Sequence, residues 1–330
     1  MALAENLLKL EELVIKSCDK MLAIVGKETS GKEVTKKFVY PYLTLLHLDS
    51  LSNLTFFYPG SFTLEFPALN TLLLFSCFKL KLFQSEHLEG DPEGSSTSIY
   101  KQPVILDLRA IPKLKVLSLD WKDVSALCFR LFTENLPYLD TLGVTFYDLN
   151  SDDMQSVFLF EILEKTLNVK KLYIGHCGRP EILLNQNPNN CEEMMLGHLE
   201  MLLLDQCHGL NYLFTSSLAM KLIYLEKIKV EKCRTMTRIV ERDDASERIK
   251  LEKLSLIVLN SLSSLECFYS GSETLQLPSL AQVGIYACPQ MKIFSQGSID
   301  VESIISIEID DDLIFYDDLN MSVEVKFTQR

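Results

Sequence analysis

The chain has 330 residues, of which 47% are hydrophobic, and its formal net charge is −13. So apolar a composition excludes a disordered chain, and the acidic balance argues against nucleic-acid binding, which needs a basic face. Its nine cysteines include no C-x-x-C pair, and no apolar run approaches the roughly 20 residues of a membrane helix, so we expect a cytoplasmic protein without disulfides, secretory signal or membrane association.

One nine-residue pattern recurs along the chain, with apolar residues at positions one, four and six and often cysteine at position nine. It first appears as Leu10, Leu13, Ile15 and Cys18. Most copies follow one another at, or close to, the spacing of roughly 20–29 residues that is typical of leucine-rich repeats. The eleven copies begin at Leu10, Leu43, Leu69, Leu114, Leu139, Val169, Leu199, Leu225, Leu251, Leu280 and Ile304.

Within each copy, positions four and six alternate as in a β-strand and point into the core, whereas positions three, five and seven point the other way. Each repeat therefore adds one parallel strand and returns as loop or a short helical turn, and residues 155–166 are long enough for a full helix. We predict an α/β solenoid, a leucine-rich-repeat horseshoe of about 11 irregular repeats with a parallel concave sheet and a convex side of loops and short helices.

The solenoid is expected to span residues 1–312, followed by a C-terminal capping segment at residues 313–330. Residues 84–103 are acidic, rich in Ser and Gly, and predict an exposed loop. In the capping segment Val323, Val325 and Phe327 alternate with polar residues, which predicts a closing strand over residues 321–327. No polar cap precedes the first repeat, so we expect the chain to be the C-terminal part of a longer protein.

Cysteine fills position nine in six of the eleven copies, where leucine-rich repeats generally carry Asn or Cys. One cysteine per repeat does not provide the clustered ligands at short spacing that zinc needs. We therefore predict buried, reduced thiols and no bound metal. The six are Cys18, Cys77, Cys177, Cys207, Cys233 and Cys288.

No pattern in the sequence favours catalysis. The segment Gly26–Glu33 nearly matches a phosphate-binding loop, but Glu33 stands where a Ser or Thr hydroxyl must bind magnesium. There is no G-x-S-x-G motif, and the five histidines are scattered. We therefore expect no enzyme activity, no cofactor, and no catalytic or metal-binding residue.

Protein binding is the better hypothesis, because side chains at positions three, five, seven and eight should line the concave face. Large aromatics and clustered charge are typical of interface hot spots. A partner that docks on the lysine strip should present an acidic surface. The candidate binding residues are Phe75, Trp121, Phe146, Tyr173, Lys227, Lys229, Lys232, Lys253 and Tyr286.

The residues between the copies of the nine-residue pattern carry a second indication of function. The segment FVYPYLTLLHLDSLSNLTFFYPGSFTLEFPALNTLLLFSCFKLKLF, residues 38–83, resembles the C-terminal repeats of plant intracellular immune receptors of the coiled-coil, nucleotide-binding, leucine-rich-repeat class. Residues 210–240 and the sequence Asp318-Leu319-Asn320 are similar as well. The resemblance implies a non-catalytic sensor and autoinhibitory module in plant disease resistance, which detects a pathogen effector directly or through a guarded host protein.

The resemblance also implies a possible second partner, the nucleotide-binding domain of a parent receptor. Another class of function stays open from the sequence: a leucine-rich-repeat adaptor, such as a ubiquitin-ligase substrate receptor or a receptor ectodomain fragment. An upstream nucleotide-binding domain in the parent gene would favour the immune receptor, whereas an F-box or a signal peptide would favour the alternative.

Overall fold

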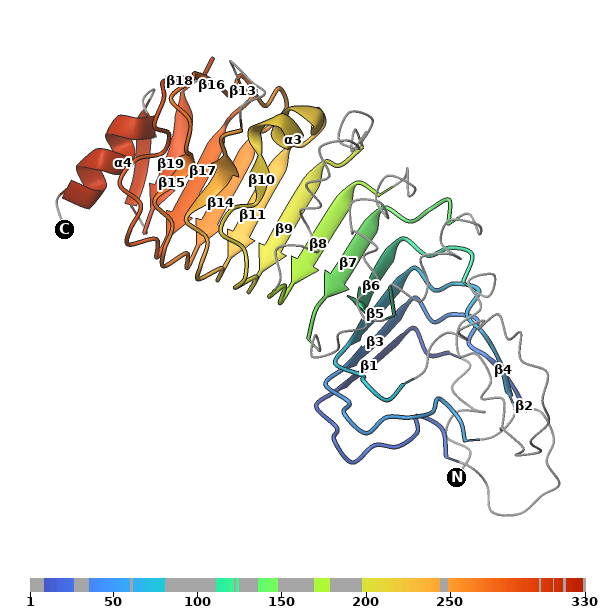
Figure 1. Cartoon of the computed structure of the whole chain (residues 1–330). Coiled ribbons are helices and arrows are strands. Elements are labelled where there is room, and N and C mark those ends of the chain that lie inside the picture. Colours follow the sequence, from blue (N-terminus) through green and yellow to red (C-terminus); the bar gives the residue numbers. More distant parts are fainter. Residues whose placement is uncertain are drawn as a thin grey trace, which may run out of the picture. The chain divides into compact units, whose positions relative to one another are not determined.

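The chain folds into two units, Met1–Leu139 and Asp140–Arg330, and each is described by itself. In both units of this computed structural model, successive strands lie side by side and the chain returns behind them before it enters the next strand (Figure 1). The structure describes residues 9–26, 36–59, 62–80, 111–121, 123–124, 136–147, 169–178, 198–243, 249–302, 304–310, 312–316 and 319–328.

The first unit contains four parallel strands of the predicted kind within its described residues. They are β1 (Glu12–Lys16), β3 (Leu45–Asp49), β5 (Thr71–Phe75) and β6 (Val116–Asp120), paired in that order. On the return path, β2 (Lys36–Val39) pairs in parallel with β4 (Phe62–Glu65). Rings from these two strands and from the turns beside them form an aromatic cluster of Phe38, Tyr40, Phe57, Tyr58, Phe62 and Phe66.

The second unit continues the same repeat with seven parallel strands, and an eighth strand pairs antiparallel to the last of them. We call these eight strands the main sheet of the second unit. They are β7 (Thr141–Thr145), β8 (Lys171–Gly175), β9 (Met201–Asp205), β11 (Lys227–Glu231), β14 (Leu256–Asn260), β17 (Gln282–Tyr286), β19 (Ile305–Ile309) and the antiparallel β20 (Asp312–Tyr316). The predicted parallel leucine-rich-repeat sheet is confirmed.

The return side of the second unit has more strand than the sequence predicts. Besides loops and the short helix α3 (Ser216–Lys221), it contains two three-stranded parallel ladders. The return segments of neighbouring repeats therefore also satisfy their backbone hydrogen bonds in sheet form. The ladders are β10 (Phe214–Thr215), β12 (Arg238–Glu241) and β15 (Cys267–Tyr269), and β13 (Ile249–Lys250), β16 (Leu275–Gln276) and β18 (Ile299–Asp300).

Alternation of side chains explains why these segments form strands. In β9, Leu202 and Leu204 are 2% and 0% exposed, whereas Met201 and Leu203 on the other face are only half-buried. Each leucine buried in this way stabilises the fold by about 1.5–3 kcal/mol. Every strand of this pattern except β1, where Leu13 and Ile15 are half-buried, contributes two such buried positions to the core behind the strands.

A left-handed residue ends most of the strands at position eight. Its backbone N–H donates to the following repeat, as from Gln206 to the carbonyl of Glu231 at 3.0 Å and from Lys232 to that of Asn260 at 2.8 Å. These hydrogen bonds fix the turn and join one repeat to the next. The position-eight residues with positive φ are Ser17, Ser50, Ser76, His176, Gln206, Lys232, Ser261 and Ala287.

The repeat that we expected to begin at Leu251 begins at Leu254, so its predicted frame is wrong by three residues. Strand β14 buries Ile257 and Leu259. Leu251 belongs to the turn that leads into the strand, where the N–H of Leu254 donates to its carbonyl at 3.4 Å. The lead-in turn also places apolar residues three apart, so both frames satisfy the same pattern.

The predicted closing strand over residues 321–327 is also wrong, because α4 (Leu319–Thr328) is a helix. Its buried residues Leu319, Ser322 and Val323 are spaced three and four apart, which places them on one helical face. The closing strand is β20, which follows a tight turn containing Asp310 with a φ of 43°. A left-handed residue is what a short antiparallel hairpin requires. Within the described residues, no helix is long and apolar enough to cross a membrane.

Five of the six position-nine cysteines are buried free thiols, as predicted, but Cys18 is exposed. No described strand stacks on the outer side of β1, so the first turn has less cover than the others. The predicted helix at residues 155–166, the loop at 84–103 and Glu33 lie outside the described residues.

Candidate recognition face

The solvent face of the main sheet carries three rows of side chains, because the parallel strands align positions three, five and seven from repeat to repeat. We call this surface of the second unit the recognition face. From β8 to β17, row three contains Lys171, Met201, Lys227, Leu256 and Gln282, row five contains Tyr173, Leu203, Lys229, Val258 and Gly284, and row seven contains Gly175, Asp205, Glu231, Asn260 and Tyr286.

Two of the predicted lysines stand in the middle of this face, on β11. Lys227 is exposed and Lys229 is half-buried. Among the residues that the structure describes, neither forms an ion pair with a carboxylate. They therefore place two uncompensated positive charges on the surface of an acidic chain.

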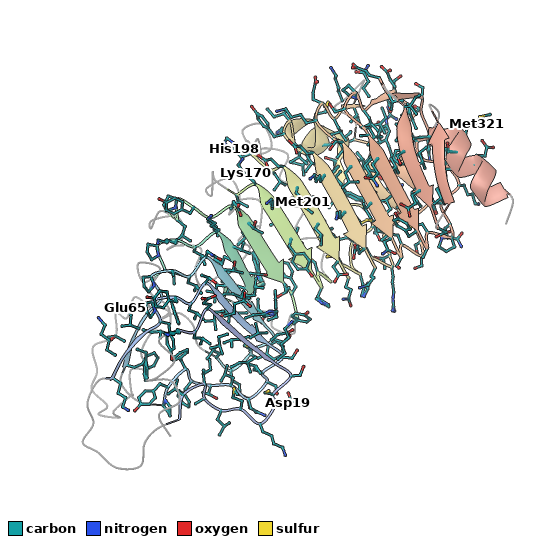
Figure 2. The ribbon with its side chains drawn as sticks, turned by 180° about the vertical axis from the view of Figure 1, so that it is seen from behind. Asp19, Glu65, Lys170, His198, Met201 and Met321 are labelled. Carbon is teal, nitrogen blue, oxygen red and sulfur yellow. The ribbon has the colours of Figure 1, made fainter. Side chains whose placement is uncertain are left out.

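Apolar side chains flank the lysines on both sides, and the sequence analysis missed them. Lys227 lies between Met201 of β9 and Leu256 of β14 in register, and Lys229 lies between Leu203 and Val258. All four apolar side chains are half-buried. Figure 2 labels Met201 at the start of β9, next to Lys170. The correct frame for β14 would have assigned Leu256 and Val258 to this face.

Two predicted aromatics lie flat on the face over glycine residues. A Cβ built on Gly175 would be 2.9 Å from the Oη of Tyr173, and one built on Gly284 would be 2.7 Å from Cε2 of Tyr286. Such covering of a strand glycine restores the packing that the missing side chain would provide. Burial raises the pKa of the Tyr173 hydroxyl well above its usual range.

Carboxylates collect in row seven, at the C-terminal ends of the strands. Asp205 and Glu231 are adjacent in this row, and the Nζ of Lys232, another predicted residue, is 3.8 Å from Oδ1 of Asp205. Nearby, the rings of His176 and Tyr147 are in contact, with centroids 4.1 Å apart and ring planes tilted by 34°. Burial lowers the pKa of His176. The face thus combines the lysines of rows three and five, and the apolar side chains that flank them, with carboxylates in row seven.

Two predicted aromatics are buried and do not belong to a solvent face. Trp121 is 6% exposed and Phe146 is 4% exposed. Both occupy position eight, yet neither has the positive φ of the other residues there. In these repeats position nine is Lys122 or Tyr147 instead of cysteine, and Tyr147 is exposed. The position-eight ring is thus buried in these two repeats, without the left-handed backbone of the eight residues named above.

Lys253 also lies off the face, because of the corrected frame of its repeat. It stands in the lead-in turn before β14, and its Nζ is 4.1 Å from the centroid of the Tyr224 ring. Phe75 does occupy position seven, on β5 of the first unit, where it is half-buried and its ring is 5.8 Å from that of His47 in an edge contact. The structure therefore places Tyr173, Lys227, Lys229 and Tyr286 on the recognition face and Lys232 at its edge, beside Asp205 of row seven.

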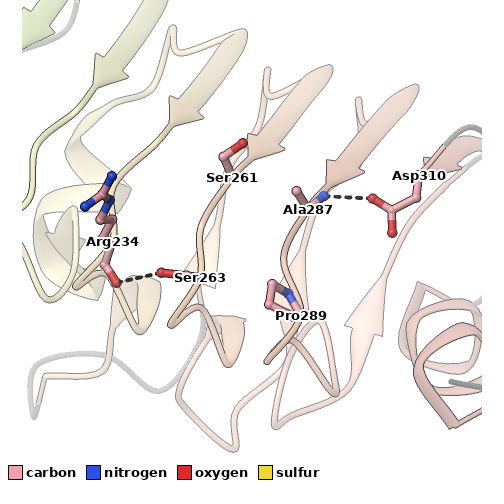
Figure 3. Close-up of a pocket in the computed structure, with 6 residues that line it drawn as sticks. All are labelled: Arg234, Ser261, Ser263, Ala287, Pro289 and Asp310. Carbon is pink, nitrogen blue, oxygen red and sulfur yellow. Dashed lines mark hydrogen bonds between the residues drawn. The ribbon is translucent and has the colours of Figure 1, made fainter.

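A shallow hollow of about 570 Å³ lies beyond the C-terminal ends of β11, β14 and β17 (Figure 3). On its walls the Ser263 hydroxyl donates to the carbonyl of Arg234 at 3.4 Å, and the N–H of Ala287 donates to Asp310 at 2.7 Å. No group of three or more His, Cys, Asp or Glu side chains in the described ranges could hold a metal ion. The hollow is lined by Arg234, Ser261, Ser263, Ala287, Pro289 and Asp310.

Comparison with known proteins finds a family model that matches part of this surface. Residues 180–299 match the family described as plant disease resistance protein RPS2-like, leucine-rich repeats. No curated protein and no solved structure matches the chain. The matched segment includes β9, β11, β14 and β17, which carry both lysines and their apolar flanks.

Proposed function

From the RPS2-like plant disease resistance repeats that residues 180–299 carry, we propose that this chain is a non-catalytic protein-recognition module of a plant innate-immune receptor. It senses a pathogen effector or a guarded host protein through the recognition face. The observation that carries the proposal is the pair Lys227 and Lys229, held without a described ion-pair partner between apolar side chains inside the matched segment.

The composition of the face supports binding to a protein. Interfaces favour Tyr, Met and other apolar groups that bury area at low cost in entropy, with charges that set specificity. Tyr173, Tyr286 and Met201 provide the first kind of group, and Lys227 and Lys229 provide the second. Because the chain is acidic overall, most of its surface repels an acidic partner, and attraction is concentrated at β11.

The same face can serve the resting state of a receptor. An acidic surface of the nucleotide-binding domain of a parent receptor would compete with the sensed protein for the lysines of β11, so recognition would release inhibition. The proposed location is the cytoplasm, which the seven described free cysteines support, because thiols persist in a reducing compartment.

The test compares the double variant Lys227→Glu, Lys229→Glu with the control Lys221→Glu, Lys292→Glu. In each pair one lysine is exposed and one is half-buried, but the control lysines lie on the return side. Proximity labelling in leaf tissue, followed by direct binding with the purified full chain, should identify a partner that wild type and control bind and the face variant loses. Disruption of the gene should change resistance to a pathogen.

Two results would contradict the proposal. If every directly binding partner tolerates the face variant but is lost in the return-side control, recognition occurs on the other side of the solenoid. If the face-dependent partner is a ubiquitin-ligase subunit and loss of the gene leaves pathogen resistance unchanged, the chain is an adaptor of another kind.

A further inference from the structure

The distance between the apolar side chains on the recognition face limits which kind of partner segment can contact all of them. Met201 and Leu203 lie on β9, Leu256 and Val258 lie on β14, and β11 separates them. Neighbouring strands are about 4.8 Å apart, so the two apolar pairs are separated by roughly 10 Å, with the lysines midway.

A partner segment that crosses these strands must present two apolar contacts at that separation on one side. In an α-helix, residues i and i+7 point the same way and are about 10.5 Å apart along the axis. In an extended strand, residues on one side are about 6.7 Å or 13 Å apart, so neither spacing fits. The apolar spacing therefore selects a helix over an extended peptide.

The charges agree with the same arrangement. Residues i+3 and i+4 of such a helix lie about 4.5 and 6 Å beyond the first contact, which places them over β11. Carboxylates at these positions would meet Lys227 and Lys229, which have no carboxylate partner in the described part of the chain. Long lysine stems also let the ammonium groups reach a ligand while the carbons pack against it.

The width of the face matches as well. Row three and row seven are about 13 Å apart along the strands, close to the diameter of a helix with its side chains, about 10–12 Å. A helix centred on row five therefore has one flank beside Lys171 and Lys227 and the other beside Asp205 and Glu231. Because one flank is basic and the other acidic, a helix with unlike charges on its own two flanks would bind in one of the two possible chain directions across the strands.

We propose that the protein recognised by this chain presents an amphipathic α-helix laid across β9, β11 and β14. The helix carries apolar residues at i and i+7, carboxylates at i+3 and i+4, and basic residues on the flank that faces Asp205 and Glu231. This inference rests on the proposed function, because it names the class of partner that the same face takes.

The probe is a displayed library of 18-residue helix-favouring peptides with randomised surface positions, selected against the full chain. Enriched sequences should share the apolar i, i+7 and acidic i+3, i+4 pattern. For a synthetic peptide of the consensus, the Kd should rise at least about tenfold with Lys227→Glu, Lys229→Glu, and by less than about twofold with the control Lys221→Glu, Lys292→Glu. Replacing Glu by Gln at i+3 and i+4 should weaken binding to the wild type and remove most of the difference between the wild type and the face variant.

The outcomes separate this inference from the function on which it rests. Enriched peptides that need β11 but are basic, or that bind in extended form by circular dichroism, overturn the acidic helix and leave the recognition face in place. Enriched peptides that bind equally to wild type and to the face variant overturn both. The predicted pattern with sensitivity to the face variant supports both.

Discussion

The ring of Tyr286 lies over Gly284 so closely that a Cβ on the glycine would be 2.7 Å from Cε2. The two residues are neighbours on the recognition face of β17, where Gly284 contributes no side chain of its own. The absence of a side chain at Gly284 thus lets the Tyr286 ring pack flat against the strand, so the ring is available to a partner in one orientation.

Gly284→Ala should displace this ring without unfolding the protein. The obstacle is the far end of a side chain, so Tyr286 can rotate away, and the gain in strand propensity from alanine offsets part of the lost contact. We expect the free energy of unfolding to change by less than about 1 kcal/mol, while affinity for a face-binding partner falls as in Tyr286→Ala. A thermal melt and a binding titration measure the two effects. Normal affinity in both variants would show that the ring is not part of the interface.

Gly297→Ala should be far more damaging, because here the obstacle is backbone. A Cβ on Gly297 would meet the carbonyl oxygen of Glu273 and the backbone of Ser272 in the neighbouring return segment. We expect a loss of about 2 kcal/mol or more in the free energy of unfolding, measured with urea. Gly178→Ala, where nothing lies within 4 Å of the new atom, is the control and should have little effect. Equal stability of the two variants would contradict the packing described.

Asn320 of α4 should anchor the final return segment. Its side-chain oxygen accepts from the N–H groups of Phe294 at 3.1 Å and Ser295 at 2.8 Å, and its amide donates to the carbonyl of Ser295 at 3.0 Å. Asn320→Ala leaves buried backbone groups unsatisfied and should cost about 1–3 kcal/mol. Hydrogen exchange should increase at Phe294 and Ser295 first. Met321→Ala, at an exposed neighbour on the same helix, should leave exchange there unchanged.

His176 should make stability depend on pH in the mildly acidic range. Burial lowers its pKa below the ordinary value of 6.5 and outweighs the raising effect of Asp205, so the unfolded state binds the proton more readily. The stabilising contribution is therefore complete above the ordinary pKa and is lost as the pH falls below it. Melts between pH 8 and 5.5 should show a decline in Tm that is smaller in His176→Gln. An unchanged slope in the variant would mean that protonation of the His176 ring is not coupled to folding.

Thiol reactivity should follow burial repeat by repeat. Burial raises the pKa of Cys288 to about 11 and raises that of Cys267 to about 11, which suppresses the reactive thiolate, whereas Cys18 is exposed. Alkylation of native protein, mapped by mass spectrometry, should modify Cys18 at least about tenfold faster than Cys288. Denaturation should remove the difference. A disulfide between Cys207 and Cys233, or stoichiometric zinc, would contradict the assignment of free structural thiols.

Much of the fold could be predicted because burial leaves few choices at the frame positions. A strand that must hide Leu202 and Leu204 has only one face that can point inward, and this argument holds in every repeat but the first, where Leu13 and Ile15 are half-buried. The start of a repeat is predicted wrongly where the apolar residues fit two positions of the pattern equally well. Leucines three apart serve both the lead-in turn at Leu251 and the strand after Leu254, and only pairing with β11 decides between them.

The site could be predicted less well, because whether a side chain beside a turn is exposed depends on the space that the surrounding side chains leave for it. Trp121 and Phe146 occupy position eight, as Lys232 does, yet both are buried and neither has its left-handed backbone. In α4, alternation over residues 321–327 suggested a strand, but the contacts that decide its structure are those of Leu319 and Val323 with the preceding repeats. Short apolar patterns do not record such tertiary contacts.

The left-handed residues at position eight are sites where the side chain can change while the backbone of the turn stays the same. Their backbone is held by N–H bonds to the next repeat, and the side chains there already range over Ser, His, Gln, Lys and Ala. A turn that required glycine would forbid such variety. Substitution among these residue types can therefore alter what the neighbouring surface binds while the backbone of the turn is kept, whereas Trp121 and Phe146 occupy the same position without it. A receptor that must follow a changing partner could vary these positions without rebuilding its repeats.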